Sequence, residues 1–360
     1  MKKKIFALVL ALAMALSLAA CGDSNTPAGS GSGSGSGEEP ANISGDLVIC
    51  SSATDLDLEA ITEGFTALYP DVNIEIITCS AGEGVARVEA EGDNPTIDVF
   101  YSGLNQADGD KYAGIFENYV SSHDSELPEE YQSNNGFYNY DHLSSVVFCV
   151  NTDLEAELGI EINSYADLLN PALNGKVIIS DPTSSSAAWN NLSNIFAVYG
   201  NDSDEAWAQI EGMLQNGLIV VGSSSACFKS VQQGEYVVGL TYEDGAITLV
   251  KDGATNIEVR YPSNGTSATV FGCGLVKNGP NPENAKAMID FICSAEGQTA
   301  LAAAQQGTLR YTNAGYTAPE GAWLKPSSEI KWVDRDVEYL TANKDAILEH
   351  WNNLLAEVQG

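Results

Sequence analysis

The sequence predicts an α/β protein of two lobes, and three observations carry that prediction. After position 45, roughly 315 residues remain, which is more than one ordinary core holds and suits two lobes. Short apolar runs typical of buried strands alternate with amphipathic helical patterns, as in parallel sheets with right-handed crossovers. Most of these strands end in serine, threonine or glycine. Because ligands of such sheets bind beyond the carboxyl ends of the strands, each lobe is expected to present a polar rim.

The first 20 residues are predicted to be an export signal. Residues 2–4 are lysines, and the apolar run at 5–16 is too short to span a bilayer. The signal ends in Leu-Ala-Ala-Cys21, which resembles the bacterial lipobox, whose cysteine is lipid-modified and becomes the new N-terminus. The resemblance implies an extracytoplasmic protein, lipid-anchored to the cell membrane through Cys21. A plain secretory signal with a chance cysteine is the alternative.

Residues 21–45 are rich in glycine and serine and are expected to form a flexible tether. The formal net charge of −33 includes the three lysines of the signal, so the remaining chain is more acidic still. This acidity argues against nucleic acid or anionic lipid as a partner. The chain has only four arginines, so an anion site must use hydroxyls, backbone N–H groups or one of these few. They are Arg87, Arg260, Arg310 and Arg335.

Six cysteines follow Cys21, mostly inside or at the ends of apolar runs and without metal-ligand spacing. Buried free thiols are favoured over disulfides. Cys50 and Cys79 form the pair that is best placed to join, since both fall at strand ends that are expected to be neighbours. No metal and no other cofactor is predicted. The six are Cys50, Cys79, Cys149, Cys227, Cys273 and Cys293.

The first lobe is predicted to comprise residues 46–143 and 268–322. Its first three strands alternate with two helices, and their ends carry Ser51, Ser52 and Ser102 as candidate ligand-binding residues. For any single one of these loops, ordinary turn chemistry is the alternative. The expected strands of this lobe are 47–50, 72–78 and 97–101, and the expected helices are 56–69 and 84–91. An irregular crossing between the lobes is expected at 111–142, and a strand at 145–150 then enters the second lobe.

The second lobe is predicted to span residues 144–267 and is organised around the stretch 175–189. A buried strand at 177–180, a tight turn and a helix start are expected there, with the hydroxyls of Ser184, Ser185 and Ser186 at the junction. Free N–H groups and the positive end of a helix dipole stabilise a small anion at such a junction. An over-supplied N-cap is the alternative reading.

Two further strands of this lobe, at 218–221 and 236–241, are also expected to deliver polar residues to the rim. The first ends at Ser224 and Ser225, and the second ends in Tyr242, Glu243 and Asp244. The two carboxylates would place negative charge opposite the serine-rich helix starts, an arrangement that suits a zwitterion. The alternative is that both carboxylates simply cap the following helix. Residues 323–360 are expected to be a helical region packing on the lobes.

Five motifs together resemble the extracellular solute-binding proteins of ABC importers. The resemblance covers nearly all of residues 47–355 and points to the group with ferric-ion, phosphonate, sugar-phosphate and thiamine binders. It implies the type II periplasmic-binding-protein-like fold, in which each lobe is a mostly parallel sheet flanked by helices, and an ABC permease as partner. The motifs are GKVIISDP at 175–182, GLTYEDGA at 239–246, VRYPSNG at 259–265, NPENAKAMIDF at 281–291 and SAEGQ at 294–298.

The predicted function is capture of a small anionic or zwitterionic solute by a monomer. Ferric ion is the alternative, but the ferric-binding relatives carry two adjacent tyrosines in the segment where Tyr242 is followed by Glu243 and Asp244. A surface-anchored hydrolase is a further alternative, although the sequence lacks the Gly-x-Ser-x-Gly and His-Glu-x-x-His motifs. We expect no enzymatic activity. The expected ligand-binding residues are Ser51, Ser52, Ser102, Ser184, Ser185, Ser186, Ser224, Ser225, Tyr242, Glu243 and Asp244.

Overall fold

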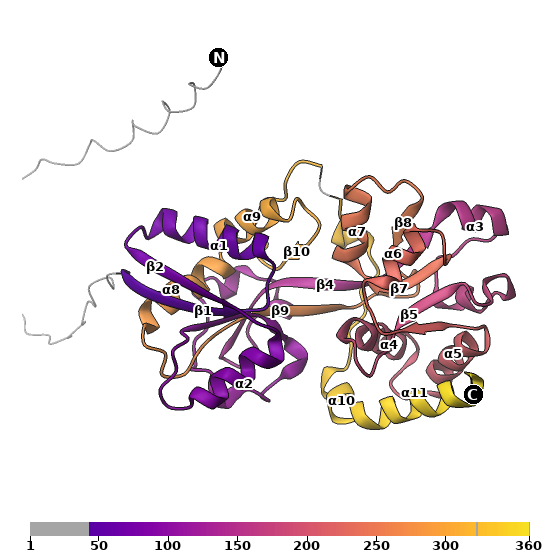
Figure 1. Cartoon of the computed structure of the whole chain (residues 1–360), viewed down its shortest axis with the longest axis horizontal. Coiled ribbons are helices and arrows are strands. Elements are labelled where there is room, and N and C mark those ends of the chain that lie inside the picture. The colour runs from indigo at the N-terminus through magenta and orange to yellow at the C-terminus, as the bar shows by residue number, and fades with distance from the viewer. Residues whose placement is uncertain (1–42, 322, 360) are drawn as a thin grey trace, which may run out of the picture. The chain divides into compact units, whose positions relative to one another are not determined.

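The computed structural model describes residues 43–321 and 323–359, shown as a cartoon in Figure 1. The expected signal, Cys21 and the tether lie outside these residues. Within them, no helix has the length and apolar character needed to cross a membrane.

A single sheet of ten strands runs through the described residues, with the order β2-β1-β3-β9-β4-β7-β5-β6, and β8 and β10 pair with β4. Three parallel strands lie toward each end of this order, and the long strands β4 and β9 lie in the middle (Figure 1). The strands are β1 (Gly45–Ser51), β2 (Val72–Thr78), β3 (Val99–Asn105), β4 (Tyr138–Asn151), β5 (Val177–Ser180), β6 (Ile219–Val221), β7 (Val238–Tyr242), β8 (Ile257–Arg260), β9 (Ala268–Leu275) and β10 (Arg310–Tyr311).

The first lobe is built on β1, β2 and β3, which pair in parallel. One apolar face of these strands packs with Ile61 and Phe65 of α1 and with Ile289 of α8, all fully buried. The other face packs with Val85 and Val88 of α2. The flanking helices are α1 (Asp55–Leu68), α2 (Ala81–Glu91), α8 (Pro282–Cys293) and α9 (Ala295–Ala304).

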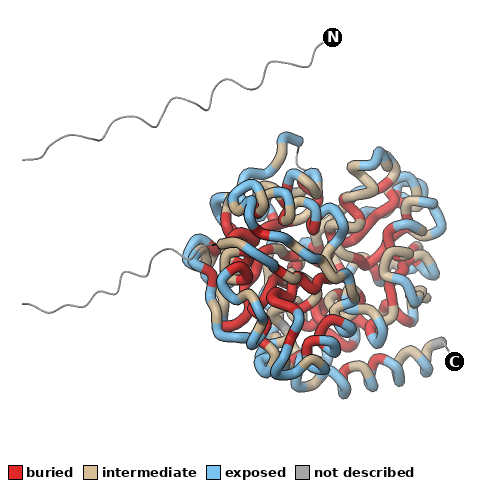
Figure 2. The backbone as a smooth tube through the Cα atoms, turned by 60° about the vertical axis from the view of Figure 1, so that its left-hand side comes forward, coloured by how far each residue is buried: buried red, intermediate tan, exposed pale blue. Residues whose placement is uncertain are grey.

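The second lobe repeats this plan with β5, β6 and β7, which also pair in parallel. Its main core lies between this sheet and the helices α4 and α5, around Leu192, Phe196 and Ile210. The helices of this lobe are α3 (Thr152–Leu158), α4 (Ser186–Tyr199), α5 (Asp204–Gln215), α6 (Ala226–Gln232) and α7 (Glu243–Lys251). Figure 2 shows buried segments running through the molecule and exposed segments at its periphery.

Strand β4 passes from one lobe to the other, and its pairing changes partner on the way. It pairs antiparallel with β9 as far as Ser145 and with β7 from Val146 onward. The lobe division that we predicted between residues 143 and 144 lies next to this change. The antiparallel strands β4 and β9 join the two sets of parallel strands into one sheet, so each lobe of the type II fold has its own parallel strands and the two lobes share the crossing pair.

The expectation of an irregular segment through residue 142 is wrong at its end, because β4 begins at Tyr138. The first half of this strand was not predicted because it contains polar residues, which are uncommon in buried strands. In the structure these polar residues have buried hydrogen-bond partners. Asn139 accepts the Ser121 N–H at 2.7 Å, and Asp141 accepts the Tyr101 hydroxyl at 3.2 Å. Short 3₁₀ helices precede β4 and recur later, at Gln106–Asp108, Ala113–Ile115, Asp124–Glu126, Glu129–Tyr131, Tyr165–Leu169, Pro171–Leu173 and Ser327–Glu329.

The C-terminal region is helical from Val337 onward and packs on the second lobe. Helices α10 (Val337–Ala342) and α11 (Lys344–Gln359) place Leu340, Ile347 and Trp351 in the core of that lobe. Before these helices the chain crosses between the lobes a third time, because β10 pairs with the first-lobe part of β4. We call residues 323–336 the strap. It bonds to the end of the second lobe, where the Val333 N–H donates to the Thr266 carbonyl at 2.9 Å.

The six cysteines in the described residues are free thiols, and five of them are buried. Cys79 is the partly exposed one, and its Sγ lies 2.9 Å from Cys50 Sγ across the ends of β1 and β2. Burial and the neighbouring Cys79 together raise the pKa of the Cys50 thiol to about 12. Cys50 is therefore a neutral thiol at physiological pH.

Candidate functional site

A cleft of about 710 Å³ lies between the two lobes at the carboxyl ends of the parallel strands. Ser52 and Ser102 line it from the first lobe, and Ser186 and Ser224 line it from the second. His142 of β4 and Phe271 of β9 contribute from the crossing strands. A solute held here would contact both lobes and the strands that join them.

The first-lobe wall is made by the end of β1 and by a bulge within β3, between Tyr101 and Asn105. Ser102 has a φ of 60°, a left-handed conformation that a serine rarely adopts, and Gly103 follows with a φ of 90°. A Cβ on Gly103 would come within 2.4 Å of Ser52 Oγ. The bulge therefore requires glycine at position 103, because the backbone there lies directly against Ser52. Unfavourable backbone conformations of this kind concentrate at functional sites.

The start of α1 completes this wall. Thr54 caps the helix and forms a capping box with Asp57, whose carboxylate accepts the Thr54 hydroxyl at 2.7 Å. Gln305, at the end of α9, donates to the other Asp57 oxygen at 2.8 Å. All three side chains line the cleft, so Asp57 brings a fixed negative charge to it.

The second-lobe wall is made by the starts of α4, α6 and α7. Ser186 is the first residue of α4, and Tyr242 directly precedes α7. The ring of Tyr242 packs edge-to-face on Phe228, with centroids 5.5 Å apart. Burial and the charge of Asp244 together raise the pKa of Tyr242 to about 12. The phenol is therefore protonated at neutral pH and can donate a hydrogen bond to a ligand.

Asp244 is the second carboxylate of the cleft. Ser144 of β4 donates to its Oδ1 at 2.8 Å, so the contact links the crossing strand to the second lobe. Burial raises the pKa of Asp244 above its ordinary value, and the Ser144 hydrogen bond partly opposes this. A cationic group on a ligand would be stabilised here, because it would offset the charge that burial disfavours.

His142 lies beside these groups and stacks on Phe271, with ring centroids 5.2 Å apart. Its Nδ1 lies 2.9 Å from Oδ2 of the fully buried Asp141. Burial lowers the pKa of His142, but the charge and hydrogen bond of Asp141 outweigh it and leave the pKa above its ordinary value. The imidazole can therefore carry a positive charge at the floor of the cleft.

The structure brings six of the predicted residues to the cleft and gives the others different positions. Ser51 is fully buried and donates to the Tyr101 carbonyl at 2.8 Å. Ser185 is the N-cap of α4 and accepts the Ala188 N–H at 3.2 Å. The residues on the wall are Ser52, Ser102, Ser186, Ser224, Tyr242 and Asp244, and those away from it are Ser51, Ser184, Ser185, Ser225 and Glu243.

Glu243 points away from the cleft into a buried ion pair with Arg310. Both of its oxygens accept from Arg310, at 2.8 to 3.0 Å, and it also accepts from the Tyr261 hydroxyl. Arg310 belongs to β10, so this ion pair joins the strand that follows α9 to the second lobe. The sequence offered no sign of it, because the partners are 67 positions apart.

Several residues of the cleft were missed by the sequence analysis. The capping-box spacing of Thr54 and Asp57 is a signal by which the start of this helix can be found in the sequence. His142 and Ser144 have no such signal, because they lie in or next to the segment predicted to be irregular. No group of three or more His, Cys, Asp or Glu that could hold a metal occurs in residues 43–321 and 323–359. The missed lining residues include Thr54, Asp57, His142, Ser144, Asn190, Phe228, Lys229, Phe271 and Gln305.

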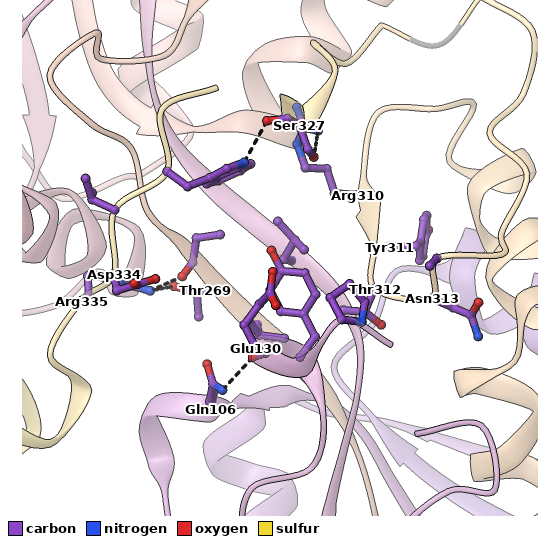
Figure 3. A pocket seen from close by; sticks show the side chains of 18 of the residues that line it. Gln106, Glu130, Thr269, Arg310, Tyr311, Thr312, Asn313, Ser327, Asp334 and Arg335 are labelled. Carbon is purple, nitrogen blue, oxygen red and sulfur yellow. Dashed lines mark hydrogen bonds between the residues drawn. The ribbon is translucent and has the colours of Figure 1, made fainter. Parts of the chain in front are cut away.

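A second cavity, of about 570 Å³, is lined by Arg310, the strap and the crossing strands. Figure 3 shows Arg310 bonded to Ser327 and Arg335 bonded to Thr269. The strap thus contributes side chains to this cavity while it passes between the lobes.

Comparison with known proteins gives a consistent result. The family model for bacterial extracellular solute-binding proteins matches residues 60–348. A Haemophilus influenzae protein is 29% identical over 321 residues, covering 86% of this chain and 91% of its own. Iron uptake protein A1 of Synechocystis is 29% identical over 250 residues, covering 64% of this chain and 66% of its own.

A solved structure agrees. The periplasmic binding protein AfuA from Actinobacillus pleuropneumoniae, with fructose-6-phosphate bound, superposes with a TM-score of 0.71 at 26% identity, covering 87% of this chain and 99% of AfuA. Such relatives are transport components rather than enzymes. The chain therefore belongs to the bacterial extracellular solute-binding proteins, the components of ABC importers that bind a small solute outside the cytoplasm and deliver it to a membrane permease.

Proposed function

We propose that this chain captures a small organic solute that is anionic or zwitterionic. The observation that carries the proposal is the composition of the cleft, which combines hydroxyl groups from both lobes with charges of both signs. Asp57 and Asp244 supply negative charge, and His142 and Lys229 supply positive charge. The hydroxyl groups can donate hydrogen bonds to a solute or accept them from it. The lining charges of both signs favour a solute that carries a negative group and a positive group.

The similarity to AfuA supports an anionic group on the solute, because that protein binds fructose-6-phosphate and is 26% identical to this chain. In this proposal the lobes close over the solute by a change of angle at β4 and β9, which are the shared strands. Ser144 contacts Asp244 at that hinge, so closure and ligand contacts are coupled.

Ferric ion is the second candidate, and the similarity to Iron uptake protein A1 favours it. Tyr242 is the one tyrosine that lines the cleft within the described residues, and its raised pKa means that iron would have to displace a tightly held proton. Titration with Fe(III) distinguishes the candidates. A phenolate-to-iron absorption band that disappears in Tyr242→Phe supports iron and contradicts the organic solute.

We also propose that the protein is a monomer anchored through a lipid on Cys21. The support for the anchor is the lipobox-like sequence that ends the signal. The support for the monomer is that the cleft is completed by one chain, with walls from both of its own lobes.

Native mass spectrometry of protein purified without refolding tests the function. We expect an additional mass of a small organic compound on the folded chain. Once that compound is identified, Ser224→Ala should weaken its binding about twofold to tenfold, the worth of one neutral hydrogen bond. Ser223→Ala is the matched control, because Ser223 lies beside Ser224 but does not line the cleft. Equal loss in both variants would contradict the proposed site.

A further inference from the structure

A smaller cavity of about 200 Å³ adjoins the ligand cleft, and we call it the side chamber. It shares Ser186, Asn190 and Phe271 with the cleft, so the two spaces meet beside the first turns of α4 and the middle of β9. A water molecule occupies about 30 Å³ in the liquid. At about 200 Å³ the chamber could hold several waters, and it therefore has room for one phosphate or carboxylate group.

Three parts of the chain enclose the side chamber. Asn105 and Asp108 come from the end of β3 and the 3₁₀ turn after it, in the first lobe. Trp189 and Ser193 come from α4 in the second lobe, and Leu340 comes from α10 in the C-terminal region. A group bound there would therefore contact both lobes, as a group in the cleft would.

The side chamber is basic, although the whole chain has a formal net charge of −33. Arg335, Lys111 and Lys344 line it, with Asp108 as the one acidic residue. Burial raises the pKa of Asp108 above its ordinary value, and the nearby lysines partly oppose that rise. Ser186 adds the positive end of the α4 dipole where the chamber meets the cleft.

Arg335 differs from every other arginine of the chain. Arg87 pairs with Glu91 at 3.0 Å, Arg260 with Glu155 at 2.5 Å, and Arg310 with Glu243 at 2.8 Å. Arg335 has no carboxylate within ion-pair distance in the described residues. It donates instead to three neutral oxygens, those of the Asn190 amide, the Ala268 carbonyl and the Thr269 hydroxyl, each at 2.7 Å.

This arrangement leaves part of the guanidinium available. Of its five N–H groups, the one on Nε and one on Nη1 have no hydrogen-bond partner in the described part of the chain. Burial lowers the pKa of Arg335 to about 10, which reflects the cost of a cation without a counter-charge. A bound anion would remove that cost.

We propose that the side chamber binds the oxyanion group of the transported solute, a phosphate, phosphonate or carboxylate. This inference rests on the proposed function and specifies the end of the solute that each space receives. Arg335 binds the oxyanion, and Lys111 and Lys344 add positive charge. The rest of the solute extends past Asn190 into the cleft, where Asp244 faces it.

The competing explanation is that Arg335 only fastens the strap to β9 and α4. Such a role predicts that substitution lowers the stability of the fold but leaves anion binding unchanged. The two lysines separate these explanations, because both are exposed and neither is in an ion pair in the described structure. Their substitution changes the charge of the chamber and leaves the contacts of the strap in place.

The test measures binding of inorganic phosphate to the full-length chain by isothermal titration calorimetry, at constant ionic strength with chloride as the balancing anion. We expect wild-type protein to bind phosphate. Lys111→Gln and Lys344→Gln should each weaken it by up to about fivefold, and Arg335→Lys by about tenfold or more. Lys286→Gln is the matched control, since it removes the same charge from α8, outside the chamber.

A second measurement connects the chamber to the solute. Phosphate should displace the compound that native mass spectrometry detects on the purified protein. Absence of phosphate binding, or binding that the lysine variants leave unchanged, overturns the proposal even where a solute is retained in the cleft. Phosphate that binds the chamber without displacing the retained compound also overturns it. A retained iron atom in place of an organic compound contradicts the proposed function itself.

Discussion

Replacing Glu243 with glutamine should destabilise the protein far more than its place at the edge of the ligand cleft implies. Glu243 is 1% exposed and Arg310 is 6% exposed, so the substitution leaves a buried guanidinium without its counter-charge. Three hydrogen bonds of 2.8 to 3.0 Å join the two side chains. Removing one partner of such a buried pair costs about 3 to 5 kcal/mol.

We expect the free energy of unfolding to fall by about 3 kcal/mol, at the lower end of that range, because Arg310 keeps other hydrogen-bond acceptors. Its Nη2 donates to the Lys325 carbonyl at 2.6 Å and its Nη1 to Ser327 at 3.1 Å. Glu155→Gln is a control of the same chemistry within one lobe. Its partner Arg260 retains an ion pair with Glu258 at 2.7 Å, so that variant should lose less.

Equilibrium urea unfolding of ligand-free protein gives these values, and a double-mutant cycle with Arg310→Met isolates the pair. A coupling energy between Glu243 and Arg310 below about 0.5 kcal/mol would refute the reasoning. Equal losses of stability in Glu243→Gln and Glu155→Gln would also refute it. Ligand affinity provides a second check. Because Glu243 points away from the cleft, affinity under stable conditions should not change. Lost affinity at full stability would return Glu243 to the ligand-binding residues expected from the sequence.

Three further predictions concern the anchor, the cap and the pH dependence. Cys21→Ala should release the protein from the membrane fraction, and unchanged membrane association would contradict the lipid anchor. Ser185→Ala should cost about 1 kcal/mol of stability, the worth of an N-cap, and leave solute affinity unchanged; a calorimetric titration that shows weaker binding would contradict this. The pKa of His142 is raised from 6.5 in the folded protein, so its stabilising contribution is present below about pH 6.5 and lost as pH rises through the folded value. His142→Gln should therefore flatten the stability profile above pH 6.5, and a profile identical to wild type would contradict the role of Asp141.

The elements that could be predicted are those whose pattern is local. The strands at 72–78 and 177–180 have the same bounds in the sequence analysis and the structure, because their apolar residues, alternating in the first and continuous in the second, end at clear turn signals. Strand β4 was found only in its second half. Its first half alternates aromatic residues with buried polar ones such as Asn139, whose partners lie far away in the sequence. No local pattern marks a polar residue as buried.

The candidate site shows the same limit at the level of single side chains. The strand ends that form the rim were predicted from the sequence, and Tyr242 and Asp244 do line the cleft. Glu243 lies between them and points elsewhere, because consecutive residues at a strand-to-helix junction project in different directions. Which residue of the three faces away depends on Arg310, and that contact exists only once β10 has paired with β4.

The distribution of cations explains how so acidic a protein can accept an anionic solute. Three of its four arginines are neutralised by carboxylates of their own structure, so they add nothing to the field at the site. The sequence left open whether an anion is bound by hydroxyls, backbone N–H groups or one of the four arginines. The strap supplies the fourth arginine, Arg335, to the lining of the side chamber next to the cleft. The hydrogen-bond acceptors of Arg335 are neutral oxygens, so its positive charge is not neutralised by a carboxylate. A region expected only to pack on the lobes would then set the orientation of the solute, with its anion toward Arg335 and its other end toward Asp244.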